Sequence, residues 1–146
     1  MARKKKILIQ TNSPKMLTGL GENGRLLMEY LMTKCKDKYE LVYYCTQQSA
    51  ADPSLQLMPC KAYGAIPNDQ NIINQLNQDP GRARDVSYGS YYIDEIVKNE
   101  KPDIWLGSDD IWSFPSIREK KWLKKLNGIF HITIDSRPVL EEAFNQ

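Results

Sequence analysis

The order of apolar runs and helical patterns is the feature that most limits what this chain can fold into. Apolar runs typical of strands lie at residues 6–11, 39–45, 104–107 and 129–134, with a further short strand expected near 57–63. Helical spacing of apolar residues occurs at 19–34, 68–78, 88–99 and 115–126, and Asp79-Pro80-Gly81 is expected to end the second of these helices. Such alternation is typical of a parallel sheet with right-handed crossovers. We therefore predict a three-layer αβα domain, with helices on both faces of the sheet.

Length and charge place the chain among ordinary globular proteins. A chain of 146 residues is long enough for one domain with a real core, so we expect residues 1–146 to form a single domain. Its net charge of +2 is too small to indicate nucleic-acid binding. The basic clusters at 4–6 and 120–125 are interpreted as solvated surface, with contact between 120–125 and an acidic membrane surface as the alternative.

Several other classes of protein are disfavoured by the sequence. The basic start, Met1–Lys6, resembles the first part of a signal peptide, but only three apolar residues follow it. No apolar run approaches the roughly 20 residues of a membrane-spanning helix. Cys35, Cys45 and Cys60 lack C-x-x-C spacing, and His131 is the only histidine, which argues against a zinc site. We expect a cytoplasmic protein with reduced, buried cysteines, no metal and no integral membrane segment.

A glycine-punctuated stretch, Gly19–Gly24, follows the first strand and opens the first helix. Unpaired amides and the helix dipole meet at such a helix start, which suits a phosphate or another anion. The stretch also matches G-x-G-x-x-G, but residues 12–18 separate it from the strand, and Thr46 rather than an acidic residue follows the second strand. NAD or NADP binding is therefore the third-ranked hypothesis. Gly24 inside the helix predicts a close approach of helix to sheet, or of a ligand to the backbone.

Three polar segments are expected at one edge of the sheet. They follow the first, fourth and last strands, at residues 12–23, 108–110 and 135–137. Ligands of open parallel sheets bind beyond the carboxyl ends of the strands, so we predict a functional cleft there, in a Rossmann-like arrangement. The plainer alternative for Asp109 or Asp110 is capping of the helix that follows.

Individual residues near that edge carry competing interpretations. Asp135 directly follows the last strand and is the candidate catalytic residue, either accepting a hydrogen bond from a sugar hydroxyl or acting as a base. His131 lies inside the strand, and an interior, hydrogen-bonded histidine is favoured over a catalytic one. The tyrosines of segment 87–92 are assigned to core packing, with stacking on a sugar ring as the alternative. For Glu22 and Arg25 the alternative to a role in the site is a position on the exposed surface of the helix.

Three segments of the chain carry a family likeness. Residues 13–25, 101–112 and 128–138 resemble, in order and separation, the glycine loop, the "kPDivw" strand with its acidic loop, and the later strand of the N-terminal domain of GT-B glycosyltransferases. The closest likeness is to the retaining, sucrose-synthase-like group, and it covers nearly the whole chain. It implies a transferase that moves a sugar from a nucleotide-sugar to an acceptor without a bound metal or cofactor.

The resemblance also implies roles for particular residues. In that family the N-terminal domain mainly holds the acceptor, while the glycine loop closes over the phosphates of the donor. By position, the resemblance assigns donor phosphate binding to Gly19, Gly21 and Asn23. The residues assigned to the acceptor side of the cleft are Glu22, Asp109, Asp110 and Arg137, with Asp135 as the catalytic candidate.

Two departures from the family pattern limit these assignments. Many members have a histidine directly before the last aspartate, where this chain has Ile134. The donor-binding C-terminal domain has no counterpart in residues 1–146, and half a cleft cannot stabilise the departing diphosphate. We therefore expect no useful sugar transfer by this chain alone, and a C-terminal GT-B domain as its partner in cis or in trans. The competing hypothesis is a non-enzymatic Rossmann-like module that binds an anion, a nucleotide or a partner.

Overall fold

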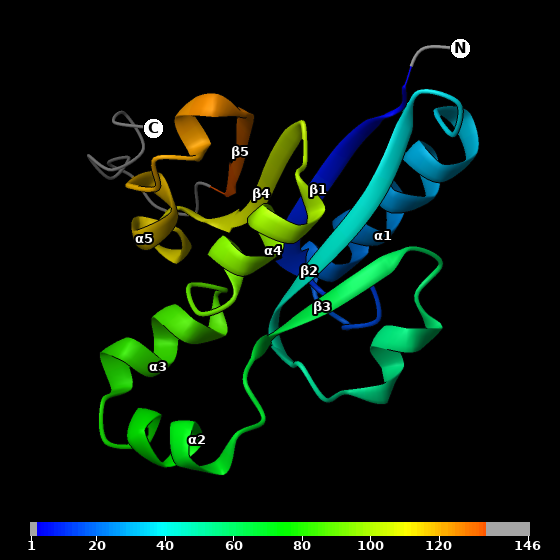
Figure 1. Cartoon of the computed structure of the whole chain (residues 1–146). Helices are drawn as coiled ribbons and strands as arrows, with labels where there is room; N and C mark the ends of the chain where they lie inside the picture. Colours follow the sequence, from blue (N-terminus) through cyan, green and yellow to red (C-terminus); the bar gives the residue numbers. More distant parts are fainter. Residues whose placement is uncertain (1–2, 134–146) are drawn as a thin grey trace.

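The computed structural model describes residues 3–133 and contains a five-stranded, all-parallel sheet (Figure 1). The strand order is β3-β2-β1-β4-β5. The strands are β1 (Lys5–Asn12), β2 (Tyr39–Ser49), β3 (Lys61–Ile66), β4 (Ile104–Asp110) and β5 (Asn127–Thr133). This is the predicted Rossmann-like α/β fold. Asp135 and Arg137, together with Ile134, lie outside the described residues.

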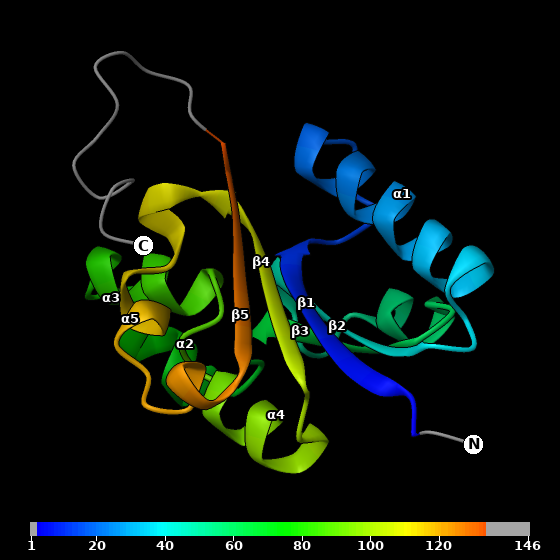
Figure 2. The same cartoon turned by 90° about the horizontal axis from the view of Figure 1, so that it is seen from above.

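Helices cover both faces of the sheet, as predicted (Figure 2). On one face lie α1 (Gly19–Lys34) and the short 3-10 helix η1 (Pro53–Leu57). The other face carries α4 (Ile93–Glu100) and α5 (Pro115–Arg118), with α2 (Gln70–Leu76) and α3 (Pro80–Ser87) beside them. Two 3-10 turns, η2 (Ile111–Ser113) and η3 (Leu123–Lys125), complete the connection between β4 and β5.

Alternation of side chains along the strands produces two separate cores. Because successive residues of a strand point to opposite faces, Ile7 and Ile9 pack under α1 while Leu8 packs under α4. On the α4 side, Trp105 is fully buried and meets Phe114 edge to face, with ring centroids 5.5 Å apart. Both faces of the central strands are therefore apolar, which is why these strands read as continuous apolar runs.

Helix α3 was not expected from the sequence, because Asp79-Pro80-Gly81 was interpreted as the end of a helix. The Asp79 side chain instead accepts a hydrogen bond from the Arg82 amide at 3.1 Å and begins a new helix, with Pro80 in its first turn. The helix expected from residue 88 accordingly begins at Ile93. Proline and aspartate mark a helix start here because proline needs no amide partner in the first turn.

Two other element predictions were shifted or wrong. The single helix expected at 115–126 is divided into α5 and η3. Between them, Trp122 Nε1 donates to Asp94 Oδ1 at 2.7 Å and Lys120 Nζ binds the other oxygen at 2.5 Å, contacts that hold this segment to α4. The strand expected near 57–63 lies at β3, because Asp52 caps the 3-10 helix that occupies residues 53–57.

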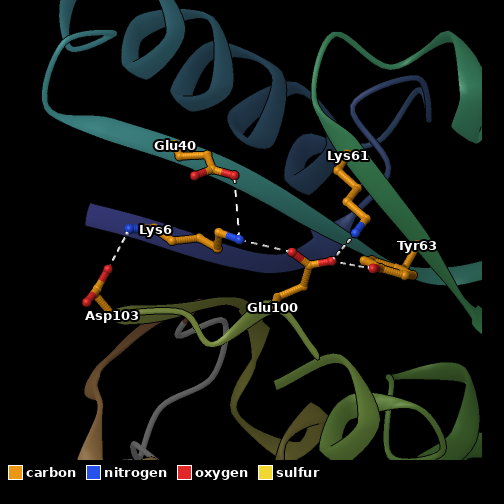
Figure 3. A network of polar contacts seen from close by, with 6 residues as sticks. All are labelled: Lys6, Glu40, Lys61, Tyr63, Glu100 and Asp103. Carbon is orange, nitrogen blue, oxygen red and sulfur yellow. Dashed lines mark hydrogen bonds and ion pairs between the residues drawn. The ribbon is translucent and has the colours of Figure 1, made fainter. Parts of the chain in front are cut away.

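An ion-pair network ties helix α4 to the sheet near the amino ends of the strands, away from the carboxyl edge (Figure 3). Its centre is Glu100, the last residue of α4, whose side chain is 5% exposed. Lys6 Nζ lies 3.2 Å from Glu100 Oε2, and Tyr63 Oη donates to Oε1 at 2.5 Å. Lys61 also pairs with Oε1. The network joins β1, β3 and α4, and so fixes the sheet to the helix layer.

Candidate functional site

The carboxyl ends of β1 and β4 form the topological switch point of the sheet. β1 pairs in parallel with β2 on one side and with β4 on the other. The chain leaves β1 toward the face covered by α1 and leaves β4 toward the opposite face. The two exits therefore diverge at this point of the edge, which is where open α/β sheets bind ligands. Gly21, which follows β1, and Asp110, the last residue of β4, share this edge.

The start of α1 is organised by Thr18. Thr18 Oγ1 accepts a hydrogen bond from the Gly21 amide at 3.0 Å, and Thr18 O accepts one from the Glu22 amide at 2.9 Å. The Gly21 amide is thus already paired within the chain. The amides at the two helix positions before it, Gly19 and Leu20, are the ones left to face an anion. A Cβ added to Gly19 would meet nothing within 4 Å, so there is room beside that residue.

Gly21 has a packing role that the motif alone did not indicate. A Cβ at this position would lie 2.4 Å from Met16 O and 2.8 Å from Ser13 O. Gly21 therefore lets the 13–18 loop fold tightly against the helix start. Of the two glycines assigned to the donor phosphates, Gly19 is the one that stands in open space.

The other assigned residues of α1 lie on different surfaces of the helix. Glu22 is exposed, and Arg25 bridges it to Glu29 with both N–O distances at 2.6 Å. The hydrogen bond from Arg25 lowers the pKa of Glu22. These contacts are those of an exposed helix surface, the alternative noted from the sequence. Asn23 lies at the mouth of a cavity under α1, and Thr11 of β1 lines the same cavity.

Asp109 is a buried carboxylate at the end of β4 and is only 2% exposed. Its Oδ1 accepts from the Asp110 amide at 2.9 Å and from Ser113 Oγ at 3.1 Å. Burial raises the pKa of Asp109. Its Oδ2 and the buried Thr46 Oγ1 make no hydrogen bond of good geometry within the described residues, but Thr46 lies close enough to lower the pKa of Asp109 slightly. Asp110, at the start of η2, makes no side-chain capping bond.

An aromatic pair stands beside these carboxylates. The rings of Tyr88 and Trp112 meet edge to face with centroids 5.1 Å apart, and Trp112 is 43% exposed. The Arg84 guanidinium lies 5.8 Å from the centroid of the Trp112 ring. Burial raises the pKa of Tyr88, and the charges of Asp109 and Asp110 raise it further, which places the phenol within their field.

Gln47 connects the end of β2 to the same cluster. Gln47 Nε2 donates to Tyr88 Oη at 2.7 Å, and the backbone of Gln47 has a φ of 58°, in the left-handed region. A glutamine in that region is strained, and such strain concentrates at functional sites. Sequence reasoning missed Gln47, Arg84 and Trp112. The signal that was present is the aromatic Trp112 two residues after the acidic pair.

His131 differs from its expected interior position. It is exposed on β5, which forms one edge of the sheet, and its Nδ1 lies 2.9 Å from Ser108 Oγ. The expectation that it is hydrogen-bonded is correct, whereas the expectation that it is interior is wrong. Among residues 3–133 its strand pairs with β4 alone, and His131 lines the cavity under α1.

The described part of the chain defines the chemistry that this edge offers. No group of three or more His, Cys, Asp or Glu in residues 3–133 is arranged to hold a metal ion. Within the same residues, no helix is both long and apolar enough to cross a membrane. Cys45 is buried, Cys35 and Cys60 are partly buried, and all three are free. The edge thus presents carboxylates, an exposed indole and helix-start amides.

Together the sheet order and this edge define a Rossmann-like α/β domain with polar and aromatic side chains gathered at its switch point. Comparisons of the chain with models of known families, with curated proteins and with solved structures produced no match.

Proposed function

We propose that this domain is the acceptor-side half of a GT-B-type glycosyltransferase and that it binds a sugar or sugar-like acceptor at the switch point. The observation that carries the proposal is the neighbourhood of the exposed Trp112 ring, the Tyr88 phenol and the carboxylates of Asp109 and Asp110. The resemblance of the three sequence segments to that family supports it.

The chemistry of sugars matches this combination of side chains. A sugar ring has an apolar face of C–H groups, which packs on an aromatic ring, and a rim of hydroxyls, which donate to carboxylates. Asp109 adds a buried oxygen, Oδ2, near the Thr46 hydroxyl, and neither atom makes a hydrogen bond of good geometry among residues 3–133. A sugar hydroxyl that bonds to Oδ2 with better geometry would contribute to affinity.

Transfer itself requires a second domain in this proposal. The described residues supply groups for the acceptor, whereas stabilisation of a departing diphosphate needs groups placed on the donor side as well. We therefore expect the chain to bind an acceptor sugar, but to turn over a nucleotide-sugar only when a donor-binding GT-B domain is present.

The test is calorimetry of the intact chain with a panel of monosaccharides and disaccharides and with nucleotide-sugars. The Trp112→Ala and Asp110→Asn variants should each weaken sugar binding by about tenfold, the effect of losing one good contact. Tyr30→Ala is the matched control, since Tyr30 is an exposed aromatic residue of α1 away from the edge. Equal affinities for all three variants and the native chain would contradict the proposal. Turnover of labelled nucleotide-sugars without a second chain would contradict the requirement for another domain.

The geometry at α1 favours one second candidate, a non-enzymatic module that binds a nucleotide or another anion. The amides of Gly19 and Leu20 at the helix start and the open space beside Gly19 are the observations that support it. Tight binding of free nucleotides without measurable sugar binding would favour this module. Sugar binding with weak nucleotide affinity would favour the acceptor domain. A fluorescence response of NADH or NADPH on mixing is expected from neither.

A further inference from the structure

A cavity lies between α1 and the sheet, on the face opposite Asp109 and the Tyr88–Trp112 pair. Its volume is about 340 Å³. The residues that line it are Ile9, Thr11, Asn23, Gly24, Leu27, Leu106, Ser108, Ile129 and His131. This volume is at the lower end of the range of small-molecule pockets, which also have mostly apolar walls and a few polar groups.

Strand register divides the floor of the cavity into two rows. Ile9 pairs with Leu106, and Leu106 pairs with Ile129, which makes an apolar row across β1, β4 and β5. Two positions further along the strands, on the same face, a polar row follows. Ser108 and His131 are register partners in this row.

Helix α1 repeats this division above the floor. Leu27 and Asn23 are four residues apart, so they lie on the same face of the helix, one turn from each other. Both line the cavity. Since α1 runs away from the carboxyl edge, Asn23 is the nearer of the two to the strand ends. The cavity is therefore polar toward the carboxyl edge and apolar toward the middle of the sheet.

Thr11, in the polar row, supplies an unused hydrogen-bonding group. It is 1% exposed, and its Oγ1 has no hydrogen-bond partner among residues 3–133. A buried, unpaired hydroxyl is costly, and buried polar groups are paired in nearly all proteins. Among residues 3–133, no lysine, arginine, aspartate or glutamate lines the cavity, so these walls do not favour a phosphate or another strongly charged group.

We propose that this cavity binds a compact, uncharged ring compound that carries a hydroxyl group, such as a phenol. The ring lies on the apolar row under Leu27, and the hydroxyl reaches the polar row, where Thr11 Oγ1 gains its missing partner. A flat ring suits a space bounded by a sheet on one side and a helix on the other. This inference does not depend on the proposed function, because it concerns the other face of the sheet.

The probes are 4-ethylphenol and ethylbenzene, which differ only in the hydroxyl group. Each is titrated into the intact, isotope-labelled chain and followed by NMR chemical shifts. We expect saturable shifts at Leu27, Leu106 and Ile129 with both probes, and about tenfold tighter binding of 4-ethylphenol, the effect of one hydrogen bond to a buried partner. Absence of saturable shifts at the cavity for 4-ethylphenol would overturn the proposal.

Two variants separate binding from folding. Thr11→Val keeps the shape of the side chain and removes the hydroxyl, so it should abolish most of the preference for 4-ethylphenol while leaving ethylbenzene binding unchanged. An unaltered preference in that variant would overturn the assignment of Thr11. Ile129→Lys should weaken the binding of both probes. Leu26→Lys is its matched control, since Leu26 is also an exposed hydrophobic residue but does not line the cavity. Equal weakening by both lysine substitutions would also overturn the proposal.

Discussion

The backbone of Gly24 lies directly over the phenol oxygen of Tyr43, so closely that a Cβ on Gly24 would be 2.1 Å from Tyr43 Oη. That phenol is fully buried and donates to Asn12 O at 3.0 Å. The contact therefore joins α1, β2 and the end of β1 at the point where the chain enters the candidate site. It explains why a glycine occupies the second turn of a helix, where glycine is otherwise unfavourable.

Gly24→Ala should destabilise the fold by about 2 kcal/mol, because the added methyl group must displace the helix or the phenol. Chemical denaturation measures the change. Tyr43→Phe removes the obstructing oxygen, at the cost of about 1 kcal/mol for the lost hydrogen bond to Asn12. The double variant should lose less stability than the sum of the losses in the two single variants. Strict additivity would show that the two residues do not interact.

Glu100→Gln should lower the free energy of unfolding by about 2 kcal/mol, since it removes the charge on which Lys6 and Lys61 converge. Glu40→Gln is the control, because Glu40 is exposed and pairs with Lys6 at the longer distance of 3.5 Å. We expect a loss close to zero for that variant. Similar losses for the two variants would contradict a central role for Glu100.

The same carboxylate makes stability depend on pH in a defined direction. Burial alone would raise the pKa of Glu100, but bonds from Lys61, Tyr63 and Lys6 outweigh it and lower the pKa to about 2. Because this value is below that of the unfolded chain, the stabilisation is complete above about pH 4.5 and is lost as the pH falls toward 2. The Glu100→Gln variant should lack this loss of stability when its acid denaturation is measured. An identical acid dependence in the variant and the native chain would contradict the role of Glu100.

Asp109→Asn should stabilise the domain at neutral pH by about 1 kcal/mol, because it replaces a buried charge with a neutral group of the same shape. Burial raises the pKa of Asp109 in the folded state, so its charged form opposes folding increasingly as the pH rises from the unfolded toward the folded pKa. Thermal unfolding at a series of pH values measures the difference between variant and native chain. A variant that is less stable at neutral pH would show that the carboxylate is needed structurally.

Thr18→Ala should cost about 1 kcal/mol by removing the cap from α1, whereas Thr18→Ser should retain most of the stability. Hydrogen exchange should be faster at Gly21 in the alanine variant, because that amide loses its acceptor. Slow exchange at Gly21 in both variants would mean that another group protects the helix start.

Local chemistry was enough to predict β1, β2, β4 and β5, helix α1 and their layering. The first helix occupies residues 19–34 as expected, because the apolar spacing and its capped start agree. The parallel order followed from the alternation of elements. Where nearby residues allowed two conformations, as at Asp79-Pro80-Gly81, the prediction was wrong, since the same residues can end one helix or begin another.

What the sequence by itself determined is the α/β class, the parallel sheet and the edge where Gly21 and Asp110 both lie. Tertiary structure decided which groups are available there. It paired the Gly21 amide with Thr18, buried the Asp109 carboxylate at the end of β4, and brought Gln47, Tyr88 and Trp112 together from separate segments. Periodicity reports only which face of an element a residue occupies, whereas contacts between elements depend on how the whole chain packs.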